Sequence, residues 1–168
     1  LEDYGRKHEL ARSLAGRFTC GEEELSQAVE RLQAQADSNF KALRAVQAEL
    51  VTAEAARLAA ATGPGGLATG VYPTWDAEQL KQLAMALRSQ PGLIIVLAGA
   101  AGHLIAACSA DRTFDAGQTL RSALAAVGGR GGGRPDFAQG AAPTWQAARQ
   151  ALNLIIDDLT TGSSASEQ

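Results

Sequence analysis

The chain contains few cysteine, histidine and aromatic residues. Its 168 residues include two Cys, two His and one Met, and aromatic residues make up 5%. Cys20 and Cys108 lie far apart with no motif around them, which excludes a disulfide-stabilised scaffold. His8 and His103 are also isolated, and no His/Cys pair has the spacing of zinc ligands. We therefore expect no metal, no cofactor and no catalytic residues in this chain.

The chain also lacks an excess of positive charge. Its 15 basic and 18 acidic residues give a formal net charge of −3, which excludes a globally basic nucleic-acid binder. Any contact with a polyanion must therefore be local. Leu1–Arg17 is rich in charged side chains and has no apolar run, so we expect no secretory signal and a cytoplasmic location.

One long stretch carries no formal charge. Pro91–Ala110 is long enough to span a membrane, but glycines divide it. The short β-rich runs Leu93–Ala98 and Leu104–Cys108 flank a turn at Gly99–His103. We interpret the stretch as a buried β-hairpin and expect no contact with a membrane.

Glycine divides the chain into two parts. Three of the 18 Gly precede residue 63, and fifteen lie at or after it. Alanine, with 35 residues, is abundant and favours helices. We predict three segments: a helical hairpin or coiled coil at 1–62, a mixed globular domain at 63–160, and a disordered tail at 161–168.

The first part has the spacing of a coiled coil. A short helix precedes a break at Thr19–Glu22, where Thr19 and Glu22 have the spacing of a capping box. A helix of about 40 residues follows, and its 4-3 pattern requires a partner helix along the seam. The predicted seam is Leu25, Val29, Leu32, Ala36, Asn39, Leu43, Val46, Leu50, Ala53 and Arg57. Two alternatives remain for one position of the seam: either Asn39 is a polar seam residue, or Phe40 takes its place.

The second part alternates strands and helices. A strand at Gly66–Tyr72, a helix capped by Asp76, the hairpin, and a helix capped by Asp115 follow in order. A glycine-rich loop and a last helix opened by Pro143 complete it. The predicted fold class is α+β, with a small sheet packed against helices.

The glycine cluster is the most unusual segment. Five of the six residues at 128–133 are Gly, and ordering each costs about 0.5–1 kcal/mol more than ordering Ala. Two explanations remain: an anion-binding loop in which Arg130 and Arg134 add phosphate contacts, or a tight packing corner. The segment has neither the Lys-Ser/Thr of a P-loop nor the glycine spacing of a dinucleotide fingerprint.

The segment from Gly128 to Gly140 resembles the glycine-rich signature of the DHH-associated domain. Its sequence GGRGGGRPDFAQG departs from the version in alanyl-tRNA synthetases and alanyl-tRNA editing proteins only at Phe137, which is usually Met. In the DHH phosphoesterases a His often stands where this chain has Arg134. Arg134-Pro135-Asp136 therefore favours the alanyl-tRNA branch, and the substrate-binding domain of a DHH-type nucleic-acid phosphoesterase is the alternative that the resemblance leaves open.

The resemblance also implies a function. The chain resembles the part of these proteins that begins just after the editing domain, and zinc is expected in that domain rather than here. It implies a non-enzymatic module that binds tRNA, with alanine tRNA as the expected partner and a homodimer through the long helix. The expected RNA contacts are Gly128, Gly129, Arg130, Gly131, Gly132, Gly133, Arg134, Pro135, Asp136, Gln139 and Gly140.

Overall fold

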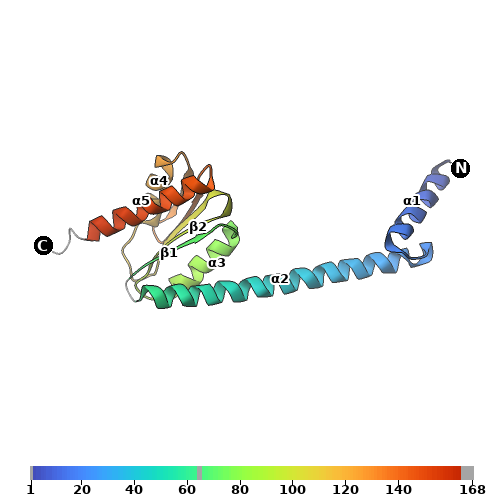
Figure 1. Cartoon of the computed structure of the whole chain (residues 1–168), viewed down its shortest axis with the longest axis horizontal. Coiled ribbons are helices and arrows are strands. Elements are labelled where there is room, and N and C mark those ends of the chain that lie inside the picture. Colours follow the sequence, from blue (N-terminus) through green and yellow to red (C-terminus); the bar gives the residue numbers. More distant parts are fainter. Residues whose placement is uncertain (1, 64–65, 164–168) are drawn as a thin grey trace. The chain divides into compact units, whose positions relative to one another are not determined.

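The computed structural model describes residues 2–63 and 66–163, and it has the predicted α+β class. It divides into two compact units, at residues 1–48 and 49–168, which are described separately (Figure 1). No described helix is long and apolar enough to cross a membrane. The predicted tail lies partly in the last helix, which runs to Ser163, and its remaining residues lie outside the described part.

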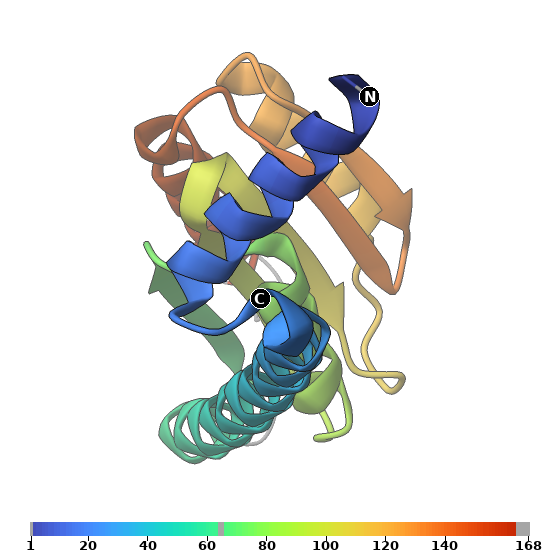
Figure 2. The same ribbon diagram turned by 90° about the vertical axis from the view of Figure 1, so that its right-hand side faces the viewer.

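The globular unit is built on a five-stranded sheet of order β1-β2-β3-β5-β4. Its strands are β1 (Leu67–Tyr72), β2 (Ile94–Gly99), β3 (His103–Cys108), β4 (Arg130–Arg134) and β5 (Phe137–Ala141). β1 and β2 are parallel, and all other pairs are antiparallel. The β4–β5 hairpin, orange in Figure 2, forms one edge of the sheet.

The locally encoded elements agree with the sequence. The uncharged stretch forms the hairpin β2–β3, joined by the short 3-10 turn Ala100–Gly102. Asp76 caps α3 (Ala77–Arg88) through a complete capping box with Gln79, and Asp115 caps α4 (Ala116–Ala126) by accepting from the Gln118 amide. These elements form where predicted because each signal lies within a few residues of what it specifies.

Two predictions at the C-terminal end are wrong. The glycine cluster is not a loop: most of it is strand β4, paired along its length with β5. The last helix, α5 (Trp145–Ser163), does not open at Pro143. Thr144 is its cap, because its hydroxyl oxygen accepts a hydrogen bond from the Ala147 amide at 3.2 Å.

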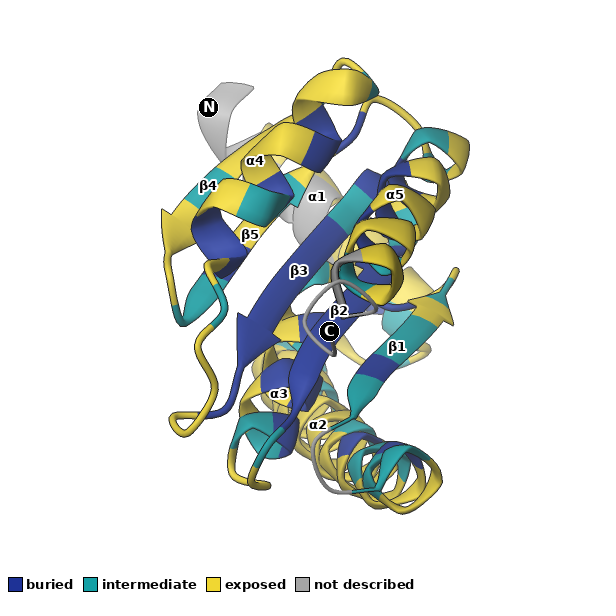
Figure 3. Ribbon diagram, turned by 90° about the vertical axis from the view of Figure 1, so that its left-hand side faces the viewer, coloured by how far each residue is buried: buried dark blue, intermediate teal, exposed yellow. Residues whose placement is uncertain are grey.

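Helices cover the two faces of the sheet unequally. On one face α4 packs over β4, β5 and β3 while α5 packs over β2, and both lie in front of the sheet in Figure 3. On the other face α3 and the end of α2 (Leu25–Thr62) pack against β1, β2 and β3. Within the globular unit, the described helices leave this second face of β4 and most of that of β5 uncovered, and α3 reaches it mainly at Phe137. We call that uncovered part the open sheet face.

The end of α2 belongs to the globular unit, and it packs there through a different face from the predicted seam. Val51 and Leu58 are both 5% exposed and lie in the core, whereas the seam residues Leu50 and Arg57 are exposed. A straight helix of 3.6 residues per turn drifts away from a 3.5-residue seam, so the docked face need not continue the heptads. Tyr72 fastens the helix to β1 by donating its hydroxyl to Glu54 Oε1 at 2.7 Å.

The N-terminal unit contains α1 (Glu2–Phe18), the 3-10 turn Glu22–Glu24 and the start of α2. The predicted capping box is absent, because Thr19 ends α1 instead of starting the next helix. Thr19 has φ of 54°, its amide donates to Gly16, and the Cys20 amide donates to Ala15. This is a Schellman motif with threonine at the position where glycine is usual.

Most side chains of the predicted coiled-coil stripe are exposed, although Leu25 and Ala36 are partly buried. Val29, Leu32, Leu43 and Val46 are exposed apolar side chains, and so is Phe40. Asn39 is exposed as well and accepts a hydrogen bond from Gln35 at 2.9 Å. Neither Asn39 nor Phe40 is therefore a buried seam residue here.

Candidate nucleic-acid interface

The register of three strands places the candidate residues on the two faces of the sheet. Neighbouring positions of a strand alternate between faces. Gly131, Gly133 and Gly140 therefore face α4, together with the buried Ala138. The open sheet face is formed by the alternate positions: Arg130, Gly132 and Arg134 of β4, and Phe137, Gln139 and Ala141 of β5.

The glycines on the α4 side are needed for close packing. A Cβ on Gly131 would lie 2.6 Å from Cδ1 of Leu124, and one on Gly133 would lie 2.4 Å from the Phe137 carbonyl oxygen. A Cβ on Gly117 of α4 would lie 2.7 Å from the Gly133 carbonyl oxygen. Helix and strand backbones therefore approach more closely than any larger residue allows. This is the packing-corner explanation of the cluster.

Gly128 and Gly129 lead the chain from α4 into β4. Gly128 has φ of 73°, which a glycine adopts without a Cβ clash. The Gly128 amide donates to Ala125 and the Gly129 amide donates to Leu124, which completes a Schellman motif. The helix therefore stops sharply, and the strand runs back along its surface.

The same strand places two arginines on the open sheet face. Arg130 and Arg134 are four residues apart, roughly 13 Å at the rise of a β-strand. Arg130 is exposed and makes no side-chain hydrogen bond or ion pair with a described residue. The guanidinium of Arg121, on α4, comes within 3.5 Å of where a Cβ on Gly132 would lie. Three guanidinium groups therefore surround β4.

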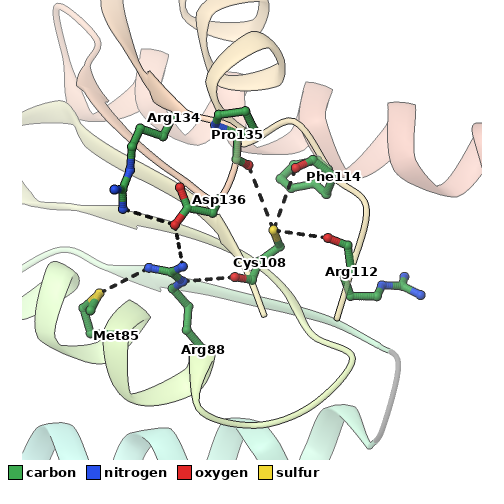
Figure 4. Close-up of polar contacts among 8 residues, drawn as sticks. All are labelled: Met85, Arg88, Cys108, Arg112, Phe114, Arg134, Pro135 and Asp136. Atoms are coloured by element: carbon green, nitrogen blue, oxygen red, sulfur yellow. Dashed lines mark hydrogen bonds and ion pairs between the residues drawn. The ribbon is translucent and has the colours of Figure 1, made fainter. Parts of the chain in front are cut away.

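Asp136 joins the β4–β5 turn to α3. Its Oδ2 accepts from Arg88 Nη2 at 2.7 Å and from Arg134 Nη2 at 3.2 Å (Figure 4). Arg88 also donates from Nε to the Cys108 carbonyl at 3.0 Å. Burial alone would raise the pKa of Asp136, but the hydrogen bond from Arg88 and the charges of both arginines outweigh it and lower the pKa. The Asp136 side chain is therefore stabilised as a carboxylate that pairs with Arg88 and Arg134.

Further contacts hold this turn in place. The Pro135 carbonyl accepts from the Ala116 amide at 2.9 Å, and the Asp136 carbonyl accepts from the Cys108 amide at 3.2 Å. Phe137 is half-buried and packs against the core on the α3 side, with Arg88 6.0 Å from its ring centroid. The position of Arg134 is therefore set by a braced turn.

Cys108 lies beneath the turn and is not a reactive thiol. It is 3% exposed, and its Sγ lies 3.8 to 4.0 Å from the carbonyl oxygens of Arg112, Phe114 and Pro135. Burial raises the pKa of this thiol, so the nucleophilic thiolate is disfavoured. Among the described residues, no group of three His, Cys, Asp or Glu is placed to hold a metal ion.

The structure brings most of the predicted residues together at one edge of the sheet, but on different surfaces. Arg130, Arg134 and Gln139 lie on the open sheet face, whereas Gly131, Gly133 and Gly140 face α4. Sequence reasoning missed Arg88 and Arg121 because both lie on helices outside the motif, Arg88 far before it and Arg121 seven residues before Gly128. The sequence shows these arginines only as positions of predicted helices. Such positions do not indicate a contact with the β4–β5 hairpin.

Curated alanine–tRNA ligases match along most of the chain: that of Acidothermus cellulolyticus is 34% identical over 90% of this chain, and that of Trichodesmium erythraeum is 30% identical over 91%. The chain spans about a fifth of the length of these relatives, 19% of each.

Two solved structures are also similar. The C-Ala domain of Aquifex aeolicus alanyl-tRNA synthetase matches 56% of this chain and 90% of its own length, with a TM-score of 0.50 and 26% identity. RecJ from Thermus thermophilus matches 87% of this chain and 26% of its own length, with a TM-score of 0.50, but at 16% identity it shares the fold alone. The DHHA1 domain model matches residues 63–161, and the chain therefore belongs to the DHHA1 domain family.

Proposed function

We propose that the globular unit binds RNA, with the open sheet face against the sugar–phosphate backbone. The observation that carries the proposal is the placement of Arg130 and Arg134 on one uncovered face of an edge strand. Guanidinium groups bind phosphate bidentately, and the spacing of the two side chains suits two different phosphates of one strand. The phosphate contacts come from strand β4, rather than from the loop that the sequence suggested.

Local charge supports the proposal even though the chain is acidic. Arg88 and Arg134 together outweigh the single carboxylate of Asp136, and Arg121 adds a further cation beside Gly132. From residue 63 onwards, however, acidic residues slightly outnumber basic ones. We therefore expect binding that is weak for this chain alone and strongly dependent on salt.

Titration of the double variant Arg130→Ala/Arg134→Ala against tRNA at two salt concentrations tests the proposal. Each lost phosphate contact lowers the slope of log K against log salt by somewhat less than one unit. The matched control is Arg149→Ala, an exposed arginine on α5. Unchanged affinity of the double variant at both salt concentrations would refute the assignment.

The expected RNA partner is tRNA, and alanine tRNA in particular. The relatives and the C-Ala domain carry names that refer to alanine–tRNA ligation, and the chain matches only part of each relative. We propose that this chain is the corresponding non-catalytic part of a longer cytoplasmic protein, either an alanine–tRNA ligase or an alanyl-tRNA editing hydrolase. Competition between alanine tRNA and an unrelated tRNA for the purified chain tests the preference.

We also propose that the exposed stripe of α2 pairs with the same stripe of a second chain. The stripe repeats through Val29, Leu32, Leu43 and Val46, and burial of such a row against a like row is the usual basis of a coiled-coil dimer. Light scattering over a concentration series tests it, with Leu43→Glu as the disrupting variant. A monomer at every concentration would exclude the dimer.

A further inference from the structure

A pocket of about 430 Å³ lies on the open sheet face, beside Arg130. The register places His103, Ala141 and Arg130 in one row across β3, β5 and β4, and it places Ile105 beside Gln139 in the next row. Ala77, the first residue of α3, closes one side. The pocket is therefore open to solvent and shaped by the strand that carries Arg130.

The lining combines an apolar floor with polar groups at the rim. The apolar lining residues include Ala77, Ala141 and Ile105, of which Ile105 is 2% exposed, while Gln139 carries an amide and His103 an imidazole. Neither Gln139 nor His103 makes a side-chain hydrogen bond with another described residue. Their donors and acceptors are therefore available to a ligand that lies flat on the floor.

A nucleobase has the matching chemistry. It is a flat ring with apolar faces, and its edge carries both donors and acceptors, which a Gln amide can pair two at a time. A base inside a duplex is stacked and paired, whereas an unpaired base of RNA can turn out to meet a protein surface. Arg130 stands at the rim, where the phosphate of the same or the next nucleotide would lie.

We propose that this pocket takes one unpaired nucleobase of the RNA whose backbone contacts Arg130. The assignment rests on the proposed function and extends it, because it adds a base contact to the backbone contacts. Recognition by the Gln139 amide and the apolar floor involves no ion pair with phosphate. The contribution of the base contact to affinity can therefore be measured separately from that of Arg130, which depends on salt.

Two variants test the pocket without removing a charge. Ala141→Leu fills it from the exposed end of β5, and Gln139→Leu removes the amide at similar size. Gln118→Leu, on α4 at the other face of the sheet, is the matched control. The probes are a short single-stranded RNA and the same backbone made with abasic sites, each titrated by fluorescence anisotropy at two salt concentrations.

We expect the unmodified protein and the control to bind the base-bearing RNA at least about fivefold more tightly, the ratio that corresponds to the lower end of base stacking energies. Both pocket variants should lose this preference while they keep the salt slope. Arg130→Ala should lower the salt slope and keep the preference. Retention of the preference in either pocket variant, or its absence from the unmodified protein, overturns the proposal.

A second measurement decides the case in which neither RNA binds and the proposed function fails. Adenosine monophosphate is titrated into the protein and followed by NMR. Shifts at His103, Gln139 and Ala141 that disappear in Ala141→Leu support a base pocket independently of RNA binding. The absence of such shifts in the unmodified protein overturns it.

Discussion

Arg88 and Asp136 lie 48 positions apart in the chain, and their side chains meet in an ion pair of 2.7 Å between Nη2 and Oδ2. Arg88 extends from the end of α3, and Asp136 lies in the turn between β4 and β5. The pair fixes the turn that joins the two strands of the open sheet face, and Arg134 shares the same carboxylate oxygen. A helix on one face of the sheet therefore positions a strand at its edge.

We expect Arg88→Met to lower the free energy of unfolding by about 1–3 kcal/mol, because it removes a hydrogen bond to a carboxylate and one to a buried carbonyl. Methionine keeps the apolar stem, so the loss reports on the guanidinium. Arg149→Met, the exposed control on α5, should change stability by less than about 0.5 kcal/mol. Equal effects in a urea titration would show that the contact does not stabilise the fold.

Acid should weaken the same contact. The pKa of Asp136 is lowered in the folded state, so its stabilising effect is present above the unfolded value of about 3.9. The effect is lost as pH falls through the lower folded-state pKa. We therefore expect Asp136→Asn to melt at a lower temperature than the unmodified protein at neutral pH, and the gap to narrow below about pH 4. A gap that stays constant down to pH 2 would contradict this.

Gly133→Ala should destabilise the globular unit by about 1–3 kcal/mol, the usual cost of overpacking. The added methyl group would lie 2.4 Å from the Phe137 carbonyl oxygen and 2.6 Å from Cα of Ala138, so backbone must move. Gly16→Ala is the opposite case, because no atom lies within 4 Å of its added Cβ and the site is helical. Calorimetry should show a lower melting temperature for the first variant and no decrease for the second.

The two cysteines should differ in reactivity. Cys108 is buried and its thiol pKa is raised, whereas Cys20 is half-buried at the end of α1. We expect iodoacetamide at mildly alkaline pH to modify one thiol per chain in the native state and both after unfolding. Cys20→Ser should abolish the native-state reaction, as mass spectrometry would show. Rapid native labelling of that variant would mean that Cys108 is accessible.

Sequence reasoning was accurate where a signal and its structure are neighbours in the chain. Asp76 and Asp115 cap their helices, and the glycines around residue 100 divide an uncharged run into two strands. It was wrong at Thr19, because a Thr three residues before a Glu suits a helix start, while the same Thr ends α1 in the structure. The pattern alone does not distinguish these two roles.

Strand β4 was missed for a different reason. Glycine has low strand propensity and no side chain to alternate between apolar and polar, so Arg130–Arg134 carries no strand signal. The glycine cluster did indicate a backbone that goes where a Cβ does not fit. The neighbour that imposes this, α4 with Leu124 and Gly117, became visible only in the folded chain.

The sequence by itself determined most of the helices, the β2–β3 hairpin and the family, because capping, periodicity and the motif from Gly128 to Gly140 are local. Tertiary structure decided which face of α2 is buried, where β4 pairs, and which cations surround it. Those outcomes depend on contacts such as Arg88–Asp136 and Glu54–Tyr72, whose partners are distant in sequence. Such contacts form only when packing compensates for the chain entropy that is lost in bringing the partners together.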